Sequence, residues 1–176
     1  TSIYTSVNRM EDQSMVPGAK FGRTNLLARA VTKFGDTDRW TADTKFQYTN
    51  AKANNRTVGG PNGTNPFYLL NLFPRTVDIT QFRDATDANG NMIWFGGGSG
   101  VNPYWASKYN VNEDVRDRFM MNASLKYEAT NWLTAEIKAG ADMYTNNSNA
   151  RTYAGSPMTA SGRYSLGKST YTETNY

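Results

Sequence analysis

Aromatic rings, arginines and scattered carboxylates are the side chains with which this chain could do chemistry. The sequence contains no histidine and no cysteine, which removes the commonest general base, the commonest transition-metal ligand and every thiolate nucleophile. Its carboxylates show no recognisable pairing for acid–base catalysis. We therefore expect no catalytic residue, no metal site and no cofactor. The residue types favour binding over catalysis, and an enzyme is only a remote alternative.

The candidates for binding lie in a long segment rich in asparagine, glycine and aromatic residues. Trp94 and Phe95 precede a run of glycines, and Tyr104 and Trp105 follow it. Aromatic rings beside hydrogen-bonding side chains are suited to binding sugars and peptides. We therefore select these four residues, with Arg75 as a polar partner, as ligand- or partner-binding residues. The alternative, that the rings only pack the loop onto itself, stays open.

The segment around Asp87 resembles a calcium-binding loop at first sight. Ala85 holds the first ligand position of such a loop, however, and Gly96 holds the position of its bidentate glutamate. Asn89-Gly90, which precedes an apolar run, instead predicts a type I′ hairpin turn. The glycine-rich residues 96–100 are expected to form a hinge inside the aromatic loop.

Four segments must form the elements that position these residues. Residues 26–34, 40–48, 118–128 and 133–143 alternate between apolar and polar side chains, and every charged residue in them falls on the polar side of the alternation. This pattern predicts an antiparallel sheet with one apolar and one polar face. A lysine or arginine that faces lipid at mid-bilayer costs about 2–4 kcal/mol. A membrane would therefore clear charge from one face in this way, with the polar face toward the lumen.

The connections between these segments alternate in length. Tight turns at 35–38 and 130–131 join the segments in pairs, whereas long polar segments run over about 51–117 and 144–162. Short periplasmic turns and long extracellular loops are typical of bacterial outer-membrane barrels. On this interpretation the tight turns face the periplasm, and residues 96–100 lie outside the cell.

Aromatic residues and strand length agree with a membrane barrel. Phe34 and Trp40 bracket the first tight turn, and Tyr127 and Trp132 bracket the second, as expected of an interfacial girdle. If the first two strands run over 20–34 and 39–53, each is about 50 Å long at about 3.3 Å per residue, which exceeds the span of a tilted bilayer. A water-soluble antiparallel sandwich or lipocalin-like barrel is the alternative fold.

Charge and apolar content exclude other classes of protein. The formal net charge of +4 is spread along the chain, without the basic run that would indicate a nucleic-acid partner. No apolar stretch approaches the ~20 residues of a transmembrane helix. No signal peptide is visible at Thr1, so we expect an export signal, if there is one, to lie outside this sequence.

Several ordered stretches resemble the SusC/RagA family of TonB-linked outer-membrane proteins of Bacteroidetes. Each stretch is weakly specific alone, but the set covers most of the chain in the order of the family's barrel region. The stretches are PGAKFGRTNL at 17–26, WTADTKFQY at 40–48, FPRTVDI at 73–79, NPYW at 102–105, RDRF at 116–119 and WLTA at 132–135.

The resemblance implies a fold, a location and partners. It implies that residues 1–176 are an all-β, antiparallel transmembrane β-barrel fragment, part of the barrel domain of a TonB-dependent receptor whose plug and closing strands are not in this sequence. Such a protein resides in the bacterial outer membrane, in contact with its lipid. It imports oligosaccharides or peptides together with a SusD-like surface lipoprotein and is powered through TonB. A passive porin or adhesin-type barrel and a soluble β-sandwich binding module are the alternative functions.

Overall fold

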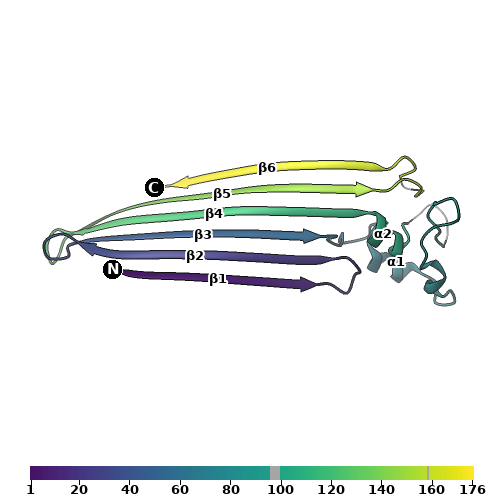
Figure 1. Cartoon of the computed structure of the whole chain (residues 1–176), viewed down its shortest axis with the longest axis horizontal. Coiled ribbons are helices and arrows are strands. Elements are labelled where there is room, and N and C mark those ends of the chain that lie inside the picture. Colours follow the sequence, from purple (N-terminus) through teal and green to yellow (C-terminus); the bar gives the residue numbers. More distant parts are fainter. Residues whose placement is uncertain (96–99, 158) are drawn as a thin grey trace.

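Alternating apolar and polar side chains suit a two-faced sheet, and the computed structural model contains one (Figure 1). It describes residues 1–95, 100–157 and 159–176. In these ranges six antiparallel strands pair in sequence order, and the sheet is open, with β1 and β6 at its edges. The strands are β1 (Ser2–Gln13), β2 (Lys20–Phe34), β3 (Trp40–Asn54), β4 (Val111–Glu128), β5 (Thr134–Thr152) and β6 (Arg163–Asn175). The prediction of an all-β antiparallel fold is confirmed.

The strands run further than the alternation predicts. The bounds expected for the first pair are close to those of β2 and β3, but β4 begins at Val111 and β5 continues to Thr152. The two long connections are therefore residues 55–110 and 153–162, shorter than the predicted 51–117 and 144–162. These strand ends are polar on both faces, so period two disappears from the sequence while backbone pairing continues.

Cross-strand register places the apolar residues of all four segments on one face. Directly opposite residues of an antiparallel pair share a face of the sheet. Leu26 lies opposite Tyr48, Tyr48 lies opposite Phe119, and Phe119 lies opposite Met143. The charged residues of the same segments fall on the other face. The predicted separation into an apolar and a polar face is confirmed.

The 55–110 loop folds at one end of the sheet (Figure 1). It contains α1 (Pro66–Leu72), η1 (Ile79–Phe82) and α2 (Pro103–Tyr109). Each begins after a residue whose side chain accepts a hydrogen bond from the first turn, and these caps are Asn65, Asp78 and Asn102. Across the described residues, no helix is long and apolar enough to cross a membrane.

The hairpin at Asn89-Gly90 is present, but its turn is not type I′. Thr86 and Met92 form an antiparallel bridge, and the Gly90 amide donates to the Asp87 carbonyl at 3.1 Å. Type I′ requires positive φ at both central residues, whereas within residues 87–91 only Gly90 has it, at 81°. The Asp87 carboxylate accepts the Asn89 and Asn91 amides at 2.9 and 2.8 Å, which favours an ordinary turn closed by a left-handed glycine. The predicted glycine hinge at 96–100 lies, except for Gly100, outside the described residues.

Register can be tested by cross-linking, because the chain has no cysteine of its own. Thr44 lies directly opposite Ala123, and opposite residues have Cα atoms about 4.5–5.5 Å apart, within disulfide range. Thr44→Cys with Ala123→Cys should form a disulfide that keeps the two fragments together after proteolysis of the 55–110 loop. Thr44→Cys with Ser124→Cys should not, because Ser124 points to the other face; a slip of one residue would exchange the two results.

Candidate functional site

Apolar and small residues form a band across one face of the sheet, here named the apolar band. A row here is the set of residues that lie directly opposite one another across neighbouring strands. The apolar band occupies the rows of one face on β2–β5, from the row of Leu26 to the row of Phe34. At about 3.3 Å per residue it measures about 26 Å along the strands. Its members are Leu26, Ala28, Ala30, Thr32 and Phe34 on β2; Trp40, Ala42, Thr44, Phe46 and Tyr48 on β3; Phe119, Met121, Ala123, Leu125 and Tyr127 on β4; and Ala135, Ile137, Ala139, Ala141 and Met143 on β5.

The apolar band has sharp limits. The edge strands keep the same character within its rows, with Ile3 and Val7 on β1 opposite Ala30 and Leu26. The next row on the loop side, however, already contains Arg9 and Asp117. Charge is therefore excluded from a defined height of this face and returns within one row.

Aromatic rings mark both limits of the apolar band. On the turn side Trp40 stacks on Tyr127 with 4.3 Å between ring centroids, and Phe34 lies 6.2 Å from Trp40. On the loop side Tyr48 and Phe119 are 4.7 Å apart. The predicted bracketing of the turns by aromatic residues thus extends into rows that cross several strands.

No second layer covers the apolar band in the part of the chain that the structure describes (Figure 1). Many of its large side chains are substantially exposed, from 38% for Leu125 to 73% for Ile137, whereas the rings of Trp40, Tyr48 and Tyr127 are less exposed. An uncovered apolar surface of this extent indicates a contact with lipid or with another protein.

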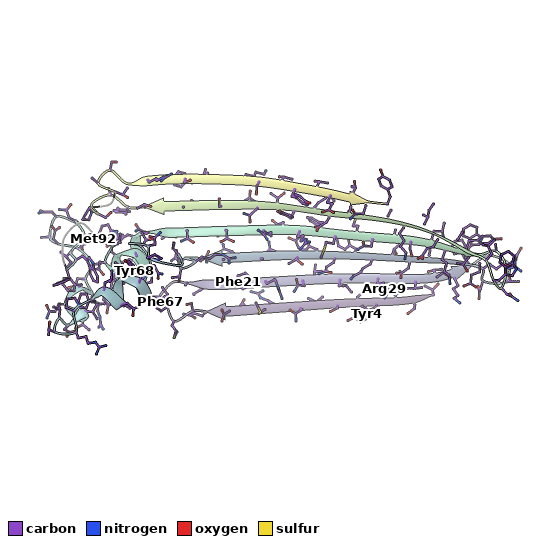
Figure 2. The ribbon with its side chains drawn as sticks, turned by 180° about the vertical axis from the view of Figure 1, so that it is seen from behind. Tyr4, Phe21, Arg29, Phe67, Tyr68 and Met92 are labelled. Carbon is purple, nitrogen blue, oxygen red and sulfur yellow. The ribbon has the colours of Figure 1, made fainter. Side chains whose placement is uncertain are left out.

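The opposite face carries paired charges. The Arg29 Nε donates to the Asp43 Oδ1 at 2.9 Å, and the Arg118 Nε donates to the Asp142 Oδ1 at 2.9 Å. Both guanidinium groups also contact the second carboxylate oxygen. Arg29 lies opposite Tyr4 of β1, well away from the loop end of the sheet (Figure 2). This face is therefore polar over the whole height of the apolar band behind it.

Two of the predicted binding residues, Trp94 and Phe95, lie in an aromatic cluster of the loop. Trp94 stacks on Phe73 at 5.3 Å and meets Phe82 edge-on at 5.3 Å. Phe95 meets Phe73 edge-on at 5.5 Å and remains 43% exposed. Arg75 is also exposed and forms no ion pair with any residue in the described ranges.

The other two, Tyr104 and Trp105, belong to the core of the loop. Trp105 is fully buried against Ala85 and Val101, and Tyr104 packs on the same core. Trp105 has no surface with which to contact a ligand, so for this residue the structure supports the packing interpretation. The five predicted residues therefore do not converge on one site, and Phe95 and Arg75 are the most exposed of them.

Asn102 holds this core together and was not singled out by the sequence. Its buried Nδ2 donates to the carbonyls of Phe82 and Ile93 at 2.8 and 2.9 Å. Its Oδ1 accepts from the Tyr104 amide at 2.9 Å. The Asn-Pro pair before a helix was the available signal, but it predicts only the helix cap.

The loop carboxylates are occupied by their own backbone. The Asn91 amide holds the pKa of Asp87 below its ordinary value, with help from the Asn89 amide. The Thr80 amide likewise lowers the pKa of Asp78. Among the described residues there is no group of three or more acidic side chains placed to hold a metal ion.

Strand pairing also brings together arginines that lie far apart in the sequence. Arg23 of β2 and Arg116 of β4 occupy one row of the polar face, with Ala51 of β3 between them. Neither residue belongs to a segment whose alternation was recognised. The signal that could have found them is the alternation itself, continued on β2 from Arg29 to Arg23 and on β4 from Arg118 to Arg116.

The loop core and the exposed cluster should respond differently to truncation. Trp105→Ala should destabilise the loop by about 3–5 kcal/mol, as is usual for a buried tryptophan, and should make residues 55–110 sensitive to protease. Phe95→Ala, which removes a half-exposed ring, should leave protease resistance close to that of the unmodified protein. Equal sensitivity of the two variants would contradict the assignment of Trp105 to the core.

No protein-family model matches the chain, and no curated protein matches it. A function must therefore be argued from its own residues. The two features available for that argument are the two-faced sheet with its apolar band and the folded loop at one end.

Proposed function

We propose that the sheet is part of the wall of an outer-membrane β-barrel, and that the protein is a SusC-like, TonB-dependent importer of oligosaccharides or peptides. On this proposal the apolar band faces lipid and the polar face lines the lumen. The 55–110 and 153–162 loops lie on the extracellular side, and the turns at 35–39 and 129–133 lie in the periplasm.

The height of the apolar band is the main observation in support of a membrane barrel. Its length of about 26 Å along the strands becomes about 20 Å when strands are tilted by about 40°, close to the apolar height of about 25 Å of outer-membrane barrels. Aromatic rows at both limits fit the girdles at the two interfaces. The return of charge at Arg9 and Asp117 fits the point at which strands leave the membrane.

Strand length and side-chain volume argue against a soluble sandwich. β4 and β5 have 18 and 19 residues, about three times the usual strand length of 5–6 residues. The middle row of the apolar band contains Ala30, Thr44, Ala123 and Ala139. A second sheet packed here would meet small side chains and leave voids that a protein core does not tolerate, whereas lipid chains adapt to such a surface.

Import and its partners are inferred from the sequence resemblance together with this geometry. A polar inner wall beneath a folded extracellular loop suits a ligand that enters from outside, and the half-exposed Phe95 is available to contact a ligand or a SusD-like lipoprotein. A passive porin would share the wall and the loop. Uptake that stops when TonB is removed supports active import, and uptake that continues supports the porin.

The lipid-facing assignment is tested by inserting one lysine on either face at the same height. Ala123→Lys places the charge in the middle of the apolar band, where it should cost about 2–4 kcal/mol and reduce the amount of protein assembled in the outer membrane. Ser124→Lys places it on the polar face between Asp43 and Lys138, where the like charge of Lys138 should cost less than about 1 kcal/mol, so it should be far better tolerated. The yield of heat-modifiable protein in outer-membrane fractions measures both, and a greater loss for Ser124→Lys would refute the assignment.

Sidedness is tested by cysteine labelling of whole cells. Ala88 lies exposed in the hairpin of the long loop, and Asp36 lies exposed in the turn between β2 and β3. A membrane-impermeant thiol reagent should label Ala88→Cys in intact cells and label Asp36→Cys only after lysis. The reverse pattern would mean that the sheet is inserted the other way round.

A further inference from the structure

Arginines gather on the polar face near the loop end of the sheet. They line an open depression of about 730 Å³, whose floor includes Ala51 and whose charged residues are Arg23, Arg56, Arg116, Arg118 and Asp114. Phe21, which also lines it, lies at the loop end of β2 (Figure 2). A depression of this size is in the usual range for a small-molecule site.

Two of these arginines are already neutralised. The Arg56 guanidinium donates to both oxygens of Asp114, at 2.7 and 3.1 Å, and Arg118 is paired in the same way with Asp142. Arg23 and Arg116 are exposed and have no acidic partner in the described ranges. The depression therefore has a positive excess contributed by these two residues.

The geometry of Arg23 and Arg116 suits one shared ligand. They lie in one row on either side of Ala51, so their Cα atoms are about 10 Å apart at two strand spacings. The alanine between them leaves room for both long side chains to turn toward a common group. The Arg116 guanidinium lies 5.2 Å from the centroid of the Tyr144 ring on β5, on the side of β4 away from Arg23, so it must leave this ring to share a ligand with Arg23.

The same face carries a smaller positive excess further from the loops. There a second depression is lined by Arg29, Lys45 and Lys138, but also by Asp43 and Glu136. Asp43 pairs with Arg29, and Glu136 pairs with Lys138. Lys45 alone is left without an ion pair here, against both Arg23 and Arg116 near the loops, so within the described ranges the positive excess is larger near the loops.

We propose that Arg23 and Arg116 form a subsite for a carboxylate of the imported ligand, so that the substrate class is acidic. The inference rests on the proposed function, in which this face lines the lumen. Arginine presents a planar fork of donors that matches a carboxylate in two-bonded geometry. An acidic oligosaccharide and an acidic peptide both supply that group, and the experiment distinguishes these two sources.

The test measures binding to the intact protein, purified from the outer membrane in detergent. The probes are trigalacturonate, triglutamate and the neutral maltotriose, each titrated by calorimetry at low salt. At least one acidic probe should bind more tightly than maltotriose, and whichever binds better identifies the source. Arg23→Gln and Arg116→Gln should each weaken that binding by about tenfold, since a hydrogen bond to a charged group is lost. Lysine at either position should give a smaller loss, because the charge remains without the fork.

Arg9→Gln is the matched control. It removes one arginine charge one row away on the opposite face, where Arg9 is paired with Glu11, and it should leave binding unchanged. Equal binding of all three probes, or acid binding retained in the double glutamine variant, would overturn the subsite. A lower outer-membrane yield of Arg23→Gln and Arg116→Gln with an unchanged ligand preference would also overturn the subsite, because the two arginines would then serve folding or assembly and not ligand binding. A protein that never assembles in the outer membrane would overturn the proposed function as well.

Discussion

The period of two along a β-strand, locked by cross-strand register, is the constraint on which the rest of the structure depends. A slip of one residue in any pair would exchange the faces of a whole strand. Both faces contribute to preventing it. On the polar face the diagonal bond from Arg29 to Asp43 offsets the like charges of Arg29 and the directly opposite Lys45, and a slip of one residue would move Asp43 to the other face and break this bond. On the other face the stack of Trp40 on Tyr127 aligns β3 with β4 beside the turns.

Sequence patterns predicted the sheet where its two faces differ and failed where they do not. Residues 40–48 were assigned correctly because their charged residues and their large apolar residues fall on opposite parities of the segment. β6 and the loop ends of β4 and β5 carry polar residues on both faces, and on β1 Arg9 and Glu11 follow Ile3 and Val7 on one face, so the alternation is lost there while backbone pairing continues. The turn before Met92 was misassigned for a related reason: the Asn-Gly pair was considered without the Asp87 carboxylate, which accepts two amides and selects another geometry.

The loop shows a second limit of sequence reasoning. Composition correctly indicated a segment with unusual aromatic content, but it could not show which aromatic residues of that segment are buried and which are exposed. Trp105 is fully buried whereas Phe95 is half-exposed. Two hydrogen bonds from Asn102 tie the start of α2 to the carbonyls of Phe82 and Ile93, and a third, accepted from the Tyr104 amide, caps the helix that contains the buried Trp105. A buried polar side chain that is fully satisfied specifies one arrangement of the chain around it, and its partners come from parts of the loop that no local motif connects.

If the sheet is a barrel wall, its two faces are under different physical constraints. Lipid fixes the composition of the outward face over the height of the apolar band and leaves little room for variation. The inward face has no such restriction, so the number and sign of its charged residues can vary to suit the ligand. Ion pairs such as that of Arg29 with Asp43 cancel most of the electrostatic field along the wall. In the row of Arg23, Ala51 and Arg116 the two arginine charges are not cancelled, so a positive field remains near the loops. A field at the entrance attracts an anion before contact is made. Selectivity on this proposal therefore resides in the register of three strands, and not in the loop aromatics that composition brings to attention first.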